Sequence, residues 1–157
     1  MQAYLPTLVW RHKKENLKKC SLRGLESRKD FIFHTFPRDS FLENLPNHYI
    51  LLDIEATPLA KEDYSKGLLI LDATWRYAKQ MITRIPQEIK IERRSIPLGF
   101  KTAYPRRQDD CFDPERGLAS IEAIYIAYTL MGRDIEGLLD NYYWKSIFLE
   151  INKGNLS

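Results

Sequence analysis

The sequence contains little cysteine and histidine. Its two cysteines, Cys20 and Cys111, are far apart and form no Cys-x-x-Cys pair. The three histidines, at positions 12, 34 and 48, lack the spacing that a zinc site needs beside those cysteines. We therefore predict neither a metal site nor a disulfide framework, since a chain of this length can fold around an ordinary apolar core.

Glycine is also scarce, with only seven residues in a chain of 157. No Gly-x-Gly-x-x-Gly segment and no Gly-x-x-x-x-Gly-Lys-Ser/Thr segment occurs, so the common phosphate-binding loops of nucleotide-binding proteins are absent. The Gly-x-Ser-x-Gly turn that carries a nucleophilic serine is absent as well. These absences exclude the commonest nucleoside-triphosphate, dinucleotide and hydrolase sites.

The sequence has no long hydrophobic run. The longest nearly apolar stretch, residues 123–131, is about half of the roughly 20 residues that a membrane-spanning helix requires. Residues 1–10 lack the basic start and apolar run of a secretory signal. We therefore expect a cytoplasmic protein with no membrane association.

Charge is small in total but uneven along the chain. The net charge is +3, yet basic residues are in excess at 11–29 and at 84–107, and residues 39–63 are acidic. Separated basic blocks can fold into one face that binds phosphate groups, although such runs are more often solvated surface. With 44% hydrophobic and 29% charged residues, the chain has the composition of one globular domain.

Short apolar runs bounded by polar turns dominate the first half of the chain. They occupy residues 8–10, 31–33, 49–52 and 68–71. The runs do not alternate with polar residues, which is typical of strands covered on both faces in a parallel sheet. We expect residues 17–27 to form a crossover helix, and the predicted fold class is α/β.

Helical spacing follows the fourth apolar run. The pattern predicts a helix over residues 75–85, with Thr74 as its N-cap and Pro86 as its stop. Two further helices are predicted over residues 118–131 and 135–151.

A turn-rich basic segment at residues 93–115 separates the two halves of the pattern. We therefore expect an α/β sheet part at residues 1–92 and a basic loop with C-terminal helices at residues 93–157, together forming one compact unit.

Asp72 is the first polar residue after the fourth apolar run, and Trp75 follows it at the start of the predicted helix. Ligands of open α/β sheets bind beyond the carboxyl ends of the strands, so both residues stand where a ligand is expected. The alternative is that Asp72 is a turn residue and Trp75 is part of the core.

Several motifs occur in a characteristic order along the chain. They are Lys-Cys-Ser at 19–21, Asp-x-x-Trp at 72–75, Arg-Arg-Ser-Ile-Pro-Leu at 93–98, Gly-Leu-Ala-Ser-Ile-Glu-Ala at 117–123, and Tyr-Trp-Lys-Ser-Ile-Phe-Leu-Glu-Ile-Asn at 143–152. This ordered set resembles the S-adenosylmethionine-dependent aminocarboxypropyl (acp) transferases that modify small-subunit ribosomal RNA. The related DTW-domain enzymes, which act on uridine in transfer RNA, share part of it.

The resemblance implies a SPOUT-like parallel sheet with a trefoil knot, followed by an all-helical C-terminal part. It also implies S-adenosylmethionine as cofactor. The residues that it assigns to the cofactor pocket are Ser21, Leu52, Leu71, Asp72, Trp75, Ile96, Leu118, Ala119 and Ser120. For the aliphatic members of this set, plain core packing is the alternative.

The implied reaction moves the 3-amino-3-carboxypropyl group to a base nitrogen of uridine or pseudouridine in RNA. Asp72 is the candidate catalytic residue, acting as general base or as orienter. Basic residues beside the pocket elements are candidates for binding RNA phosphates: Arg93, Arg94, Lys101, Arg106 and Arg107. We expect a monomer, because the C-terminal helices can cover the surface through which SPOUT enzymes dimerise.

Three other functions fit the same residues. The first is a transfer-RNA uridine acp transferase, and the second is a SPOUT RNA methyltransferase, which releases S-adenosylhomocysteine instead of methylthioadenosine. The third is a non-catalytic RNA-binding ribosome assembly factor, which binds RNA without binding S-adenosylmethionine.

Overall fold

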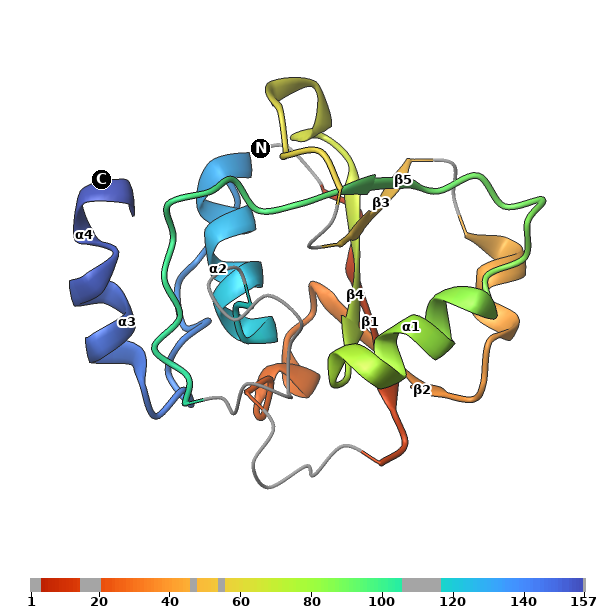
Figure 1. The fold of residues 1–157 in the computed structure, drawn as a ribbon, viewed down its shortest axis with the longest axis horizontal. Helices are drawn as coiled ribbons and strands as arrows, with labels where there is room; N and C mark the ends of the chain where they lie inside the picture. The colour runs from red at the N-terminus through yellow and green to blue at the C-terminus, as the bar shows by residue number, and fades with distance from the viewer. Residues whose placement is uncertain (1–3, 15–20, 46–47, 54–55, 106–116, 157) are drawn as a thin grey trace.

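Five parallel strands form one sheet in the order β2-β1-β4-β3-β5 (Figure 1). The computed structural model describes residues 4–14, 21–45, 48–53, 56–105 and 117–156. The strands within these ranges are β1 (Thr7–His12), β2 (Phe31–Phe36), β3 (Tyr49–Leu52), β4 (Gly67–Asp72) and β5 (Glu92–Arg94). Every neighbouring pair is parallel, so all five carboxyl ends lie along one edge of the sheet.

Helices cover both faces of this sheet (Figure 1). On one side lie α2 (Ser120–Met131), α3 (Lys145–Ile151) and α4 (Lys153–Leu156), and on the other lies α1 (Trp75–Thr83). The short 3-10 helices are η1 (Leu25–Ser27), η2 (Ser40–Asn44) and η3 (Lys61–Asp63). No helix in the described ranges is long and apolar enough to span a membrane.

Alternate residues of the central strands build two separate apolar clusters. Leu68 and Ile70 of β4 pack on the α2 face, whereas Leu69 between them packs on the α1 face with Met81. All four side chains are at most 4% exposed, and each contributes about 1.5 to 3 kcal/mol by leaving water. The prediction of strands buried on both faces is therefore confirmed.

The boundaries predicted for α1 and α2 agree closely with the structure. Thr74 occupies the N-cap position of α1 with an extended backbone, although its side chain makes no capping hydrogen bond. At the other end of α2, Gly132 adopts a φ of 71°. A left-handed glycine is a common way to end a helix.

Two helices predicted from the sequence are wrong in part. The predicted helix 135–151 is helical only over α3, because Gly137 has a φ of 80° and the preceding residues form separate turns. In the predicted helix 17–27, the described part contains turns and η1, since Gly24 has a φ of 95°. Residues 17–20 lie outside the described ranges.

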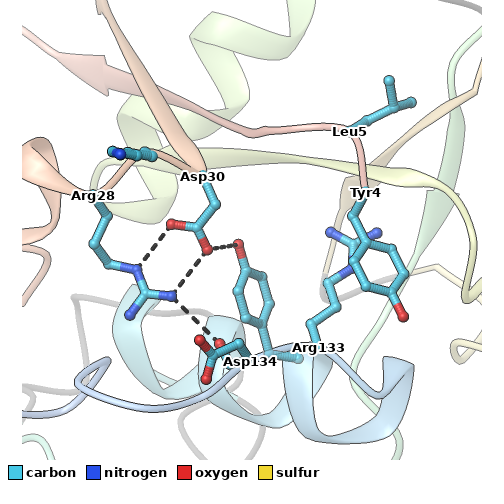
Figure 2. Close-up of a pocket in the computed structure, with 8 residues that line it drawn as sticks. Tyr4, Leu5, Arg28, Asp30, Arg133 and Asp134 are labelled. Atoms are coloured by element: carbon cyan, nitrogen blue, oxygen red, sulfur yellow. Dashed lines mark hydrogen bonds and ion pairs between the residues drawn. The ribbon is translucent and has the colours of Figure 1, made fainter. Parts of the chain in front are cut away.

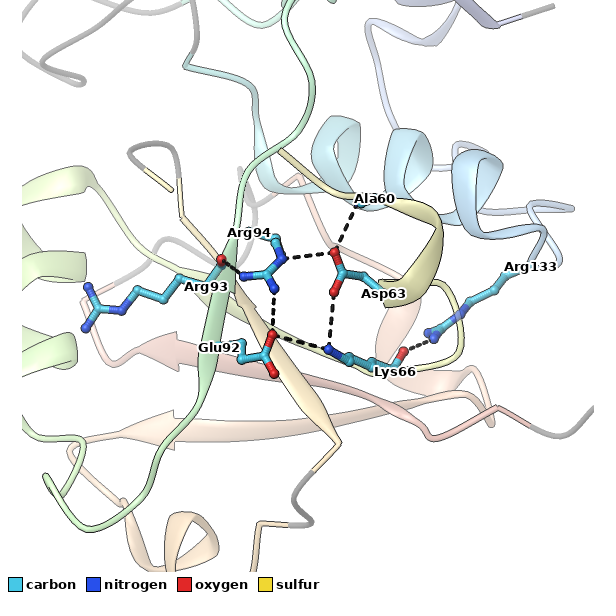
Figure 3. A network of polar contacts seen from close by, with 7 residues as sticks. All are labelled: Ala60, Asp63, Lys66, Glu92, Arg93, Arg94 and Arg133. Atoms are coloured by element: carbon cyan, nitrogen blue, oxygen red, sulfur yellow. Dashed lines mark hydrogen bonds and ion pairs between the residues drawn. The ribbon is translucent and has the colours of Figure 1, made fainter. Parts of the chain in front are cut away.

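Strand β5 was not predicted, because its residues are charged and largely exposed. It pairs with β3, and an ion-pair cluster fixes it there (Figure 3). At the centre is Asp63, which is fully buried and accepts hydrogen bonds from the Arg94 Nε at 2.9 Å, the Lys66 Nζ at 3.2 Å and the Ala60 N–H at 3.0 Å. Glu92 bridges the same two cations at 2.6 Å and 3.2 Å.

The ion-pair cluster changes the pKa of Asp63, the carboxylate at its centre. Burial opposes ionisation of Asp63, but the Ala60 N–H and the cations of Lys66 and Arg94 more than offset that effect. The pKa of Asp63 therefore lies below its ordinary value. A group with a lowered folded pKa stabilises the protein above its unfolded pKa, and this stabilisation is lost as the pH falls through the folded pKa.

We predict that Asp63→Asn destabilises the fold at pH 7 by about 2 to 4 kcal/mol, because Arg94 loses its buried counter-charge. The difference from wild type should shrink as the pH falls below about 4, where unfolded aspartate becomes protonated. Urea unfolding at a series of pH values measures both effects. A difference that is constant from pH 7 to pH 3 would contradict this role.

A second buried carboxylate, Glu122 in α2, joins three separate parts of the chain. Its side chain is fully buried. One oxygen accepts from the Thr102 hydroxyl at 2.6 Å and the Ala119 N–H at 2.8 Å, and the other from the Ala103 N–H at 2.8 Å and the Tyr142 hydroxyl at 2.9 Å. Glu122 therefore fixes the start of α2 against the segment after β5 and the turn before α3.

We predict that Glu122→Gln lowers the free energy of unfolding by roughly 2 to 4 kcal/mol. One Glu122 oxygen accepts from the Ala119 N–H and the other from the Ala103 N–H. In either orientation of the Gln side chain, its NH₂ group therefore faces one of these N–H donors and cannot accept from it. Chemical denaturation measures the loss. The matched control is Glu150→Gln on the exposed side of α3, which should change stability by less than about 0.5 kcal/mol.

Candidate functional site

The carboxyl edge of the sheet carries a buried ion pair. Asp72 is the last residue of β4 and is 3% exposed. In the parallel register it is paired with Arg11 of β1. The Arg11 Nε donates to the Asp72 Oδ2 at 3.0 Å, and both side chains are at least nine-tenths buried. The acidic residue singled out in the sequence is therefore a fixed, charge-paired group.

The start of α2 meets the same carboxylate. The Ser120 hydroxyl donates to the Asp72 Oδ1 at 3.3 Å, and the next N–H, of Ile121, donates to the Ser21 Oγ at 3.3 Å. Ser21 and Asp72, which lie far apart in the sequence, therefore contact the first two residues of α2. In this arrangement both oxygens of Asp72 accept a hydrogen bond.

Arg11 was not among the site residues predicted from the sequence, because it begins a basic run of the kind that usually forms solvent-exposed surface. The structure instead places its guanidinium 4.7 Å from the centre of the Phe33 ring and its Nη1 3.2 Å from Glu26. The alternation of side chains along the strand could have identified Arg11 as a residue of the buried face. Arg11 is two residues after Val9 and therefore shares its face, towards α2.

The predicted apolar pocket residues divide between the two faces of the sheet. Leu52, Ile96 and Leu118 are partly buried and pack on the α2-side cluster, of which Ala119 is a buried member. Leu71 packs on the α1-side cluster instead, as strand alternation requires for the neighbour of Asp72. Trp75 is the first residue of α1, and its side chain lies outside the described part of the structure.

The predicted RNA-binding cations have different surroundings. Arg94 is held in the Asp63 cluster, whereas Arg93 is exposed on β5 with its guanidinium 3.5 Å from Asp53. Lys101 is exposed, and both its backbone N–H and its carbonyl are bound by the Asn152 side chain, at 2.7 Å and 2.8 Å. The other two predicted cations, Arg106 and Arg107, lie outside the described residues.

A separate cavity of about 410 Å³ lies at the opposite edge of the sheet (Figure 2). Its lining consists of Tyr4, Leu5, Arg28, Lys29, Asp30, Tyr128, Arg133 and Asp134. Asp30 accepts two hydrogen bonds from Arg28, each of 2.9 Å, and one of 3.4 Å from the Tyr128 hydroxyl. Burial raises the pKa of Tyr128 to about 12, so this hydroxyl stays protonated at neutral pH.

This cavity is distinct from the site predicted in the sequence. Leu5 and Asp30 precede β1 and β2, which places the cavity at the amino ends of the strands. The Asp72 carboxylate is at the carboxyl ends. Cofactors of parallel α/β sheets bind at the carboxyl edge, so the Asp72 region is the candidate functional site.

Comparison with known proteins gives a structural match. No protein-family model and no curated protein sequence matches the chain. A solved structure, that of the SAM-dependent rRNA:acp-transferase Tsr3 from Vulcanisaeta distributa, is similar with a TM-score of 0.72 and 25% sequence identity, covering 98% of this chain and 82% of that chain. The match confirms the resemblance that the ordered sequence motifs indicated.

Proposed function

We propose that the protein transfers the 3-amino-3-carboxypropyl group from S-adenosylmethionine to a base nitrogen of uridine or pseudouridine in RNA, with small-subunit ribosomal RNA as its substrate class. The observation that carries this proposal is the match to the SAM-dependent rRNA:acp-transferase over 98% of the chain. The buried carboxylate at the carboxyl edge of the sheet supports it.

We also propose that the α/β part is SPOUT-like and contains a trefoil knot, as the resemblance implies. The five parallel strands support the first part of this inference. The three helices that follow β5 in the described ranges support an all-helical C-terminal part.

The residues of the candidate site fit S-adenosylmethionine chemically. The molecule carries a sulfonium and an ammonium group, and Asp72 offers a buried negative charge. It also carries a carboxylate, which suits the start of the 12-residue helix α2. The side chains of Leu52, Ile96 and Leu118, which are partly buried on the α2 side of the sheet, are the proposed wall for adenine.

When bound, S-adenosylmethionine would supply an electrophilic methylene carbon next to sulfur. The base nitrogen would form a bond to that carbon as the carbon–sulfur bond breaks, methylthioadenosine would leave, and the N–H proton of the base would pass to water. The protein's part is to orient the reacting groups. Both oxygens of Asp72 already accept hydrogen bonds, from Arg11 and Ser120. Because these two hydrogen bonds hold the carboxylate in one orientation, we assign Asp72 the orienting role.

The by-product identifies the reaction. Purified protein, S-adenosylmethionine and RNA are incubated, and the released nucleoside is measured by chromatography and mass spectrometry. Methylthioadenosine supports the proposal, S-adenosylhomocysteine indicates a methyltransferase, and absence of saturable S-adenosylmethionine binding indicates an assembly factor. Parallel reactions with small-subunit ribosomal RNA and with transfer RNA distinguish the two transferase substrates.

We predict that Asp72→Asn weakens cofactor binding and transfer together, each by about tenfold or more, because Asn cannot supply the charge that orients a cation. Calorimetry measures binding, and single-turnover methylthioadenosine release measures transfer. The variant also leaves Arg11 without its buried counter-charge, so both values are corrected for the folded fraction.

Two other results for Asp72→Asn have clear meanings. Unchanged affinity with a loss of roughly 100-fold or more in transfer would make Asp72 the general base. Wild-type affinity and rate would leave it only a structural role. The control is Glu88→Gln, an exposed carboxylate whose loss should change neither value.

We predict that Arg93→Ala combined with Lys101→Ala weakens RNA binding, because up to two phosphate contacts are lost. The slope of log K for RNA binding against log salt concentration should become less steep by about 1 to 2. Cofactor affinity and stability should be unchanged, since both side chains are exposed. The matched control removes the same charge at two other exposed lysines, Lys61 and Lys90. Equal effects of both pairs on RNA affinity would show that only net charge matters.

A further inference from the structure

We propose that Arg11 is a positioning residue for the transfer reaction, holding the Asp72 carboxylate in the single orientation that the start of α2 requires. This inference rests on the proposed function, because Asp72 is the residue through which Arg11 acts. Arg11 belongs to none of the sequence motifs that indicated the function.

The first argument is the geometry of the carboxylate. A terminal carboxyl group rotates easily when it has one partner, because its torsion is broad. Asp72 accepts from two different elements, with the Arg11 Nε on Oδ2 at 3.0 Å and the Ser120 hydroxyl on Oδ1 at 3.3 Å. Rotation breaks both hydrogen bonds, so the plane of the carboxylate is fixed relative to β1 and α2.

The second argument is that Arg11 is itself immobilised. Its backbone lies in the β1–β4 ladder opposite Asp72, and its guanidinium lies over the Phe33 ring at 4.7 Å. Its Nη1 contacts Glu26, whose other oxygen accepts from the Gly24 N–H at 2.8 Å. A guanidinium with planar, fixed donors can transmit this order to a carboxylate, which a flexible ammonium does less well.

The third argument is charge. The pair is buried at the carboxyl edge, where water screens it little. An unpaired charge is strongly destabilising in such a place, and Arg11 supplies the counter-charge of Asp72. Arg11 thus orients the Asp72 carboxylate and compensates its burial.

The test is a double-mutant cycle of Arg11→Lys and Asp72→Asn. Arg11→Lys keeps the positive charge but removes the Nε donor, and single-turnover methylthioadenosine release should fall about 10- to 100-fold, as expected for a misplaced group. In the Asp72→Asn background the same change should have less than about a twofold effect, because the carboxylate that it positions is gone.

The matched control is Arg28→Lys, which makes the same substitution in an Arg–Asp pair at the opposite edge of the sheet. It should leave transfer unchanged after correction for the folded fraction. If Arg11→Lys also transfers at the wild-type rate once corrected, or if its effect is undiminished in the Asp72→Asn background, the positioning role is wrong. If the wild-type protein releases no methylthioadenosine, the proposed function fails and this role fails with it.

A measurement on the ligand-free protein keeps the inference testable should Arg11→Lys fail to fold. In nitrogen-15 NMR spectra, the Arg11 Nε–H should exchange with water at least tenfold more slowly than the Nε–H of exposed Arg93. Asp72→Asn should remove most of this protection. Equal exchange rates for Arg11 and Arg93 in the wild-type protein would overturn the proposal, because the buried ion pair would then not persist in solution.

Discussion

The buried carboxylate of Glu122 is the interaction on which the placement of the candidate site depends. Its two oxygens bind the segment after β5 through Ala103, the start of α2 through Ala119 and the turn before α3 through Tyr142. Together with the hydrogen bonds of Ser120 to Asp72 and of Ile121 to Ser21, these contacts hold the first turn of α2 against its neighbours. Ser120, whose hydroxyl donates to Asp72, belongs to the same turn.

The parallel sheet positions the other two side chains of the candidate site, Arg11 and Asp72. Parallel pairing brings the carboxyl ends of β1 and β4 side by side, which aligns Arg11 with Asp72. Strand alternation then turns both side chains towards α2 and leaves Leu71 on the other face. The site is therefore built by register and by one helix start rather than by a dedicated loop, which agrees with the scarcity of glycine in the sequence.

The buried strands and the position of Asp72 could be predicted because local patterns encode them. An apolar run such as residues 68–71 has few alternatives to a central strand, and its first polar residue marks the carboxyl edge. Strand β5 and the Arg11 ion pair could not be predicted, because their partners, Asp63 and Asp72, are 31 and 61 residues distant in the chain. Charged residues in a local pattern read as solvent-exposed, and only tertiary pairing buries them.

The ion-pair cluster around Asp63 explains why neighbouring arginines on β5 have different surroundings. Arg94 points to the buried Asp63 and stabilises the strand, whereas Arg93 points to the opposite side, where its guanidinium is exposed (Figure 3). A charge that compensates a buried carboxylate cannot also bind a phosphate without leaving that carboxylate unpaired. Along β5, strand alternation therefore leaves the Arg93 guanidinium exposed beside Asp53, so Arg93 and not Arg94 is the proposed RNA contact.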